Sequence, residues 1–336
     1  MSATALTVLL TSILLVAALG GPRIIRGSAP ALAAIPRVAT FALTLAALIW
    51  IAALLAVGPV VAWMSSGPAW LPEAAARVCS RCLSESSPFG AGAASLGIPA
   101  VVPLALPAIG AVAVTWGLLR ESRKIRRARA ALAATLLTSS ETITLLGHPV
   151  RVTRDDVPRA FSLPHRDGGV VVSRGTIRTL NTAELAAVLE HERAHLAQRH
   201  HVSLTVLLGA TSAFRWIPLI RAIRDAVPHY LEIAADQAAK RATGTTALAS
   251  ALLKLTGARC GDGEMAETND GSHAGSPPAH TVLHAAASDR IKSLVGQPRT
   301  PASTALAAAV GLYAFMLVAV ILAINLPYVL ALATGC

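Results

Sequence analysis

The sequence predicts a helical multi-pass membrane protein with four spans and one cytoplasmic α+β domain. Three observations lead to this prediction. Of 336 residues, 54% are hydrophobic and only 14% are charged, whereas soluble domains are about a quarter charged. Four uncharged stretches are each about 20 residues long, which is the length that a bilayer requires. Between the third and fourth stretches, a longer polar region mixes strand-like and helical patterns.

The four apolar stretches are the predicted spans. They comprise residues 3–20, 41–63, 98–119 and 303–325. The first has the length of a signal peptide, but no basic residue precedes it, so a retained span is expected. The chain is therefore expected to divide into a three-span membrane region (1–119), a soluble domain (120–302), and a fourth span with a short tail (303–336).

Charge in the connecting segments predicts the orientation. Residues 21–38 carry three arginines and no acid, and residues 120–129 carry six basic residues against Glu121 alone. Because basic segments stay in the cytoplasm, the domain is expected inside and both termini outside. The net charge of +11 is mainly this topology signal, although the basic run could also bind anionic lipids of the bilayer. Since the basic residues form no aromatic-interleaved patch, direct nucleic-acid binding is not expected.

Three further segments give structural expectations, two of them with alternatives. Cys79 and Cys82 form a C-x-x-C pair, for which a disulfide is preferred to a zinc or redox site. The apolar stretch 202–220 contains Arg215 and several hydroxyl side chains, so a buried or interfacial helix is preferred to a fifth span. Residues 260–282, rich in Gly, Ser, Pro and acids, are expected to form a flexible loop.

Within the soluble domain, strand-like segments precede helices. Residues 143–153, 160–163 and 170–173 have strand-like content, and the turn at 164–169 predicts a hairpin or small meander. Asn181 and Glu184 then form a capping box. This box predicts a helix from residue 182 to about 200.

That helix carries the H-E-x-x-H motif. His191 and His195 are four residues apart, so both imidazoles share one helical face and can bind a single Zn²⁺. Glu192 is placed to act as general base towards a water molecule on the metal. By the same reasoning, His200 and His201 fall off the ligand face and are expected to be solvated.

A second pair of acids follows on an otherwise apolar helix. Glu232 and Asp236 are again four residues apart, and two acids are costly to bury there unless they bind a metal or a hydrogen-bond donor. Glu232 is therefore the expected third zinc ligand. Asp236 is expected to accept the other ring N–H of a ligating histidine. The alternative is a solvated acidic face.

At these residues the chain resembles the gluzincin membrane metallopeptidases. The order of three spans, zinc domain and fourth span resembles the BlaR/MecR family of antibiotic-sensing signal transducers. This resemblance implies a zinc endopeptidase that cleaves a cytoplasmic protein, such as a transcriptional repressor, or itself. Residues 161–164 also resemble the edge strand that such peptidases offer to an extended substrate. Only residues 326–336 follow the fourth span, so the extracellular sensor domain of that family is not expected.

The chain also resembles prenyl-protein and heat-shock membrane peptidases, which carry His-Pro-x-x-x-x-Arg-Ile after the third ligand. Residues 284–291 have the same spacing, with Ala285 in place of the proline. The resemblance implies that His284 or Arg290 stabilises the oxyanion; an ion pair is the alternative for Arg290. Those peptidases insert membrane helices before the third ligand, for which residues 202–220 are too short, so the sensor-transducer family is the closer fit.

Two other functions remain open at this point. One is a general quality-control protease for misfolded membrane proteins, and the other is a non-catalytic, zinc-stabilised signalling scaffold. The intact motif favours an enzyme over a scaffold, because a degenerate enzyme could lose Glu192 without losing the metal. The sequence predicts no oligomeric state.

Overall fold

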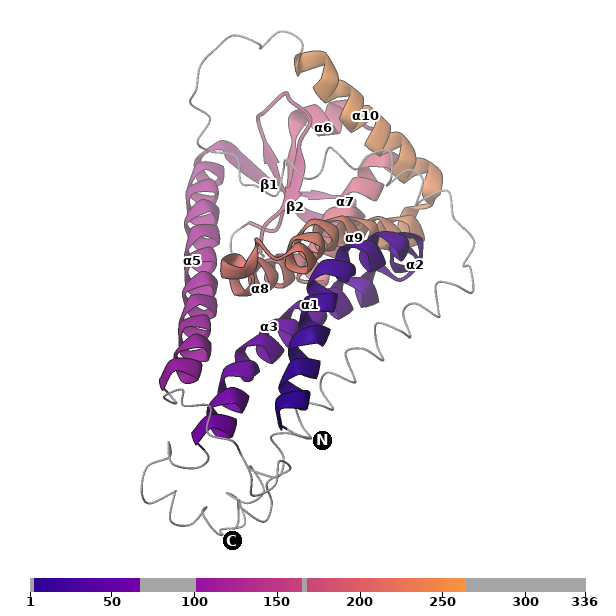
Figure 1. Ribbon diagram of the computed structural model, residues 1–336. Helices are drawn as coiled ribbons and strands as arrows, with labels where there is room; N and C mark the ends of the chain where they lie inside the picture. Colours follow the sequence, from indigo (N-terminus) through magenta and orange to yellow (C-terminus); the bar gives the residue numbers. More distant parts are fainter. Residues whose placement is uncertain (1–2, 67–100, 165–167, 264–336) are drawn as a thin grey trace, which may run out of the picture.

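The computed structural model describes residues 3–66, 101–164 and 168–263. Within them the fold is a helix-rich α+β arrangement, as predicted. In Figure 1, the long helices α1, α3 and α5 extend towards one end of the molecule. The sheet, α6 and α10 lie at the other end, and α8 and α9 lie between the two parts.

Two helices at the start of the chain match predicted spans. Helix α1 (Ala3–Gly27) and helix α3 (Pro36–Ser66) are joined by the short helix α2 (Ala29–Ala34). By length and composition, Val8–Gly27 and Pro36–Gly58 could each cross a membrane. Predicted span 303–325 lies outside the described residues. The count of four spans and the cytoplasmic orientation therefore stay predictions.

Helix α5 (Val101–Ser139) contains most of the predicted third span and leads into the sheet. Its 39 residues correspond to a length of about 58 Å. The helix continues unbroken through the basic run at 120–129 and ends where strand β1 begins. Before that run, Ile109, Val112 and Trp116 are each more than 60% exposed. Large apolar side chains exposed together on one helix are expected of a surface that contacts lipid.

The sheet has four strands in the order β1-β2-β4-β3. The strands are β1 (Ser140–Leu145), β2 (His148–Thr153), β3 (Ala160–Ser162) and β4 (Val170–Ser173). The predicted hairpin is confirmed, because β3 pairs antiparallel with β4. In addition, β2 runs parallel to β4. Strand β3 is thus at one edge of the described sheet.

The strand predicted at 143–153 is in fact a second hairpin. Strands β1 and β2 pair antiparallel around Leu146 and Gly147, which have φ angles of 52° and 80°. Two consecutive positive φ angles define the turn that best matches the twist of paired strands. Since leucine is an unusual residue at the first of these positions, the sequence pattern did not reveal the turn.

Helix α7 (Thr182–Ala197) follows the short helix α6 (Arg174–Thr179) and begins at the predicted capping box. The Asn181 side chain accepts from the Glu184 N–H, and the Glu184 carboxylate accepts from the Asn181 N–H, both at 2.9 Å. The apolar side chains Leu185, Val188 and Leu189 pack against the valines of β2 and β4. This packing holds α7 against one face of the sheet.

Helix α10 (Thr245–Gly263) is fixed to α7 through the same glutamate. Ser250 Oγ and Lys254 Nζ donate to the Glu184 carboxylate at 2.5 and 2.8 Å. The first four residues of the predicted loop 260–282 belong to this helix. The rest of that loop lies outside the described residues.

The apolar stretch 202–220 forms no span. It comprises most of α8 (His200–Ala210), the 3₁₀ turn η3 (Ser212–Phe214) and the start of α9 (Pro218–Thr243). At 11 residues, α8 is about 16 Å long, well short of a bilayer core of about 30 Å. It packs closely on α5, where a side chain on Gly117 would overlap the carbonyl oxygen of Gly209. This agrees with the expectation of a buried or interfacial helix.

Helix α9 lies at the centre of the molecule. Its buried residues Ile220, Ile223, Val227 and Leu231 belong to one apolar core with side chains of α1 and α3. Further along, the same helix packs against α7. One helix therefore contacts both the candidate membrane helices and the helix that carries the H-E-x-x-H motif.

Candidate metal centre

Helices α7 and α9 bring the three predicted ligands together. His191 and His195 occupy the last two turns of α7, and Glu232 is on α9. One ligand atom from each residue lies within 4.8 Å of the other two. All three side chains are mostly buried, with 8%, 18% and 15% of their surfaces exposed. In the described part of the chain, no other group of three such side chains meets in this way.

The distances between these atoms fit one small cation. His191 Nε2 and His195 Nε2 are 3.1 Å apart, and each is 3.5 Å from an oxygen of Glu232. Tetrahedral Zn²⁺ binds nitrogen and oxygen at about 2.0–2.1 Å, which puts neighbouring ligand atoms about 3.3 Å apart. The three residues are therefore already spaced as zinc ligands would be.

Asp236 supports the first histidine. Its side chain is only 1% exposed, and its Oδ1 lies 2.9 Å from His191 Nδ1, the ring nitrogen that faces away from the ligand cluster. A carboxylate in this position fixes the tautomer and the orientation of a ligating imidazole. The geometry is the one expected from the four-residue spacing of Glu232 and Asp236.

The cluster is electrostatically suited to a positive charge. Burial opposes the charged form of His191, but hydrogen bonding to Asp236 and Glu232 outweighs it and raises the pKa of His191 to about 10. Two buried carboxylates thus surround one imidazole and stabilise a cation next to them. A divalent metal satisfies the same demand at the point where the Nε2 atoms and the Glu232 carboxylate converge.

The expectation that His200 is solvated is wrong. His200 is 4% exposed, and its Nδ1 lies 2.8 Å from Nδ1 of His195. The cause is a break in the helix: α7 ends at Ala197, and Arg199 adopts a left-handed conformation with φ 52° and ψ 39°. Because of this turn, the His200 side chain faces the His195 ring. On a continuous helix, His200 would point away from that ring. Burial and the nearby His195 lower the pKa of His200 to about 3, so its imidazole is neutral.

Of the predicted catalytic residues, only Glu192 lies among the described residues. The Glu192 side chain is partly exposed and directly precedes the outward-facing Arg193 on α7. His284, Arg290, Cys79 and Cys82 lie outside the described residues. Strand β3, which contains part of the predicted substrate edge at 161–164, contacts α7.

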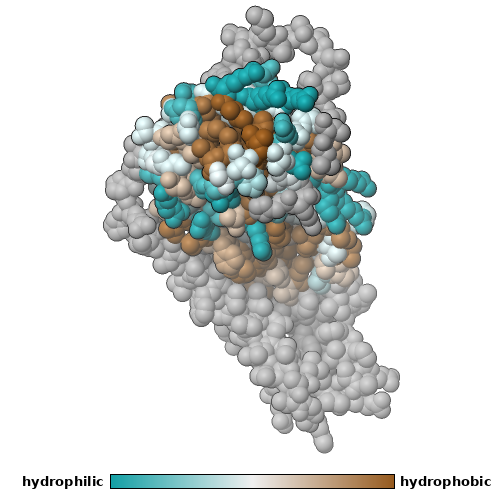
Figure 2. Space-filling model, turned by 180° about the vertical axis from the view of Figure 1, so that it is seen from behind, coloured by the Kyte–Doolittle hydropathy of each residue, from teal (hydrophilic) through white to brown (hydrophobic). Residues whose placement is uncertain are grey.

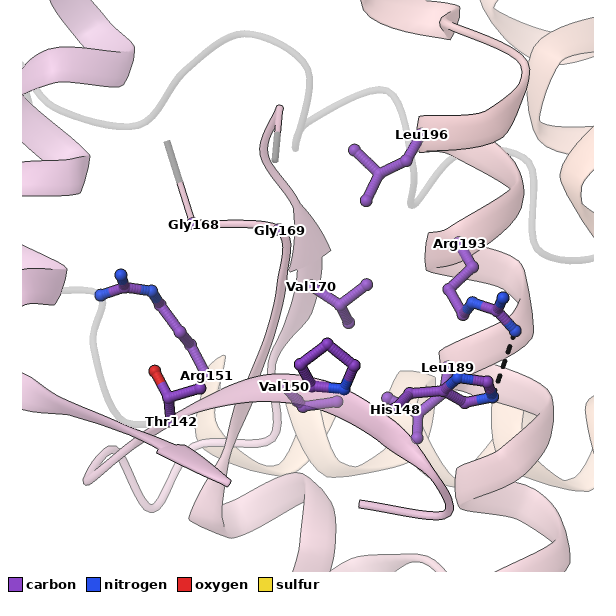
Figure 3. A pocket seen from close by; sticks show the side chains of 11 residues that line it. Thr142, His148, Val150, Arg151, Gly168, Gly169, Val170, Leu189, Arg193 and Leu196 are labelled. Atoms are coloured by element: carbon purple, nitrogen blue, oxygen red, sulfur yellow. Dashed lines mark hydrogen bonds between the residues drawn. The ribbon is translucent and has the colours of Figure 1, made fainter. Parts of the chain in front are cut away.

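A cavity on the opposite face of α7 is separate from this cluster. It has a volume of about 360 Å³ and lies between the sheet and Leu189, Arg193 and Leu196 of α7. Figure 3 shows His148 and Arg193 at its edge, joined by a hydrogen bond. None of the three candidate ligands lines it. From behind, Figure 2 shows an apolar area framed by hydrophilic side chains on the upper part of the molecule.

An H-E-x-x-H helix and a glutamate from a following helix, meeting at one point, define the gluzincin class of metallopeptidase sites. The comparison with protein families agrees and is more specific. Residues 120–297, just over half of the chain, match the model of peptidase family M48. The protein belongs to this family, whose members are metal-dependent peptidases.

Individual relatives match over a shorter region. Two proteins named Protease HtpX homolog, from Bordetella petrii and Bordetella avium, are 37% and 35% identical to the chain over 71 residues. That region is 20% of this chain and 24% of each relative, so the match spans about a quarter of the length of these curated relatives. No solved structure matches the chain. The BlaR/MecR-type specificity, and the expected lack of its sensor domain, stay predictions.

Proposed function

We propose that the protein is a zinc-dependent endopeptidase of the membrane. The observation that carries this proposal is the convergence of three ligand atoms from His191, His195 and Glu232 at separations of 3.1–3.5 Å. Membership of peptidase family M48 supports the same conclusion independently. A structural zinc site would use four protein ligands, whereas the three that converge among the described residues leave a position open for water or substrate.

Each residue then has a distinct role. His191, His195 and Glu232 hold the metal, and Asp236 orients His191 through Nδ1. A Zn²⁺ ion held by these residues would supply Lewis-acid chemistry, which makes water a stronger nucleophile at neutral pH and polarises the substrate carbonyl. Glu192, next to His191 on the same helix, accepts the proton of the attacking water and returns it to the leaving amine. His284 or Arg290 is proposed to stabilise the oxyanion, as the resemblance implies.

An extended peptide is the substrate form that the sheet suits. Strand β3 pairs with β4 on one side only within the described sheet, and it contacts the helix that carries the metal ligands. An edge strand binds an extended segment through backbone hydrogen bonds, which require no particular side chains. We therefore propose that the substrate aligns along residues 160–164 with its scissile bond near the metal.

Two substrate classes follow from the two resemblances. Similarity to proteases named HtpX homologues favours a quality-control peptidase that cuts unfolded or misfolded membrane proteins at many sites. Packing of α9 on α1 and α3 supports cleavage close to the membrane surface. The alternative, suggested by the span order, is cleavage of one defined site in a cytoplasmic protein such as a repressor. Under either proposal, the domain at 120–302 faces the cytoplasm.

The Glu192→Gln variant tests the mechanism. It removes the base and leaves the three ligands, so zinc should stay bound at wild-type stoichiometry while cleavage of an unfolded casein substrate is lost. Glu190→Gln is the matched control, because Glu190 is on the same helix but pairs with His148 and Arg193. Cleavage by Glu192→Gln at the wild-type rate would refute the proposal and favour a non-catalytic scaffold.

Substrate choice is tested in cells. Membrane and cytosolic proteomes are compared between cells with the wild-type protein and cells with Glu192→Gln. Many new N-termini from unfolded membrane proteins would support quality control, and a single new N-terminus would support a dedicated substrate. Protease accessibility of residues 260–282 in spheroplasts tests the orientation, since a cytoplasmic domain protects this segment until the membrane is permeabilised.

A further inference from the structure

A chain of hydrogen bonds runs from the second histidine of the motif to the start of helix α3. His195 Nδ1 lies 2.8 Å from His200 Nδ1, and His200 Nε2 lies 3.1 Å from Gln198 Oε1. Arg37 Nε donates to the same Gln198 oxygen at 3.0 Å. Arg37 is in the first turn of α3, 161 residues before Gln198 in sequence. These hydrogen bonds therefore connect the cluster of candidate metal ligands to the beginning of a candidate membrane span.

The direction of every proton in this chain is determined by its two ends. At one end, the ligand atom of His195 is Nε2, because that atom faces His191 and Glu232. A neutral ring that binds a metal through Nε2 carries its proton on Nδ1, so His195 donates to His200. His200 then accepts on Nδ1 and has its own proton on Nε2, which donates to Gln198 Oε1.

At the other end, arginine fixes the amide. A guanidinium has only donors, so the Gln198 atom that faces Arg37 must be the oxygen. That oxygen accepts from both Arg37 and His200, and the same arrangement of donors and acceptors results from either end. A consistent hydrogen-bond network requires this agreement between its two ends. If one residue had its donor and acceptor exchanged, two donors or two acceptors would face each other in a buried position.

The middle of this chain is protected from water. His200 is 4% exposed and lies in the turn between α7 and α8, where its ring meets that of His195 edge to face at a centroid distance of 4.7 Å. Arg37, in contrast, is exposed. The inner contact is thus the strong one, and the outer contact competes with solvent.

We propose that His200 is a positioning residue for the metal ligand His195, and that Gln198 and Arg37 extend this support to the start of α3. This inference rests on the proposed zinc site. It gives His195 an acceptor at Nδ1, as Asp236 gives one to His191, but this acceptor is a neutral imidazole from a different part of the protein. It also makes the affinity for the metal sensitive to the position of a candidate membrane helix.

The test compares variants of His200 in the full-length protein in lipid nanodiscs. The dissociation constant for Zn²⁺ is measured by competition with a chromogenic chelator. His200→Phe fills the space but offers no acceptor, so affinity should fall on the order of 10- to 100-fold, as for other partners of metal-binding histidines. His200→Asn keeps a side-chain carbonyl acceptor and should restore most of that loss.

A second pair of variants tests the link to α3. Arg37→Ala should weaken Zn²⁺ binding about fivefold or less, because the contact is exposed. Arg23→Ala, which changes an exposed arginine of α1, is the matched control and should have no effect. Since Arg37 acts through Gln198, the loss in Gln198→Ala should not increase further when Arg37→Ala is added.

The visible absorption spectrum of the Co²⁺-loaded protein gives a readout besides affinity. Loss of the acceptor lets the His195 ring rotate, so His200→Phe should change the band shape and His200→Asn should retain it. Equal Zn²⁺ affinity and equal spectra for wild type, His200→Phe and His200→Asn would overturn the inference. Because neither readout requires proteolysis, a protein that binds zinc through this network without cleaving peptides would refute the proposed function and leave this inference intact.

Discussion

The contact between Asp236 and His191 offers a quantitative test of the metal centre. Asp236→Asn preserves the shape of the side chain and removes its charge. In the wild-type protein, the pKa of His191 is raised from 6.5 to about 10. At 1.36 kcal/mol per pH unit, this corresponds to about 5 kcal/mol in favour of the charged imidazole, after the opposing effect of burial. This net value is what Asp236 and Glu232 together contribute beyond the cost of burial, so loss of the Asp236 charge should remove at least half of it.

The same carboxylate is expected to stabilise zinc bound at this site. A loss of 10- to 100-fold in metal affinity is usual when the partner of a metal-binding histidine is removed, and it equals about 1.4–2.7 kcal/mol. We therefore expect Asp236→Asn to weaken Zn²⁺ binding by one to two orders of magnitude. The assay is chelator competition, with Asp225→Asn, an exposed acid of the same helix, as the matched control.

The pH dependence of the metal-free protein gives an independent check. A raised folded-state pKa stabilises the fold fully below pH 6.5 and progressively less as pH rises towards 10. The thermal unfolding midpoint of the metal-free wild type should therefore fall between pH 6.5 and 10. In Asp236→Asn this fall should be much smaller. Unchanged Zn²⁺ affinity together with a wild-type pH profile would show that the reasoning about Asp236 is wrong.

Two further predictions concern stability. Hydrogen bonds from Lys254, Ser250 and Asn181 lower the pKa of Glu184 to about 2 from 4.5, so the stability from this contact should be lost as pH falls from 4.5 through 2. Lys254→Met should lower the thermal unfolding midpoint at neutral pH. An unchanged midpoint would contradict the role of this pair. Gly117→Ala places a methyl group against the Gly209 carbonyl, whereas nothing lies within 4 Å of a side chain on Gly20. Differential scanning fluorimetry should therefore show a lower midpoint for Gly117→Ala than for Gly20→Ala, and the reverse order would refute the close packing of α5 on α8.

The chemistry of the candidate site could be predicted largely from local sequence. The capping box at Asn181 and Glu184, and the spacing of His191 and His195, act within a few residues of one another. Helical geometry places residues four positions apart on one face regardless of the remaining fold. The same rule paired Glu232 with Asp236. In both cases the pattern contained the geometry within one helix, so the candidate ligands could be named without the fold, whereas their proximity depends on the packing of α9 on α7.

The tertiary structure decided what depends on breaks and on distant contacts. A left-handed residue at Arg199 and a turn at Leu146 carry weak sequence signals, since neither is glycine or asparagine. The first break turned His200 from an expected surface residue into a neighbour of His195, and the second divided one expected strand into two.

By itself, the sequence determined that the protein carries long apolar helices and side chains of the types that bind zinc. Only the folded chain decided that α9 would pack against both α7 and the helices α1 and α3. The physical reason is that burial of apolar surface is non-directional. An apolar stripe shows that a helix will be covered, and only the assembled structure determines which helix covers it.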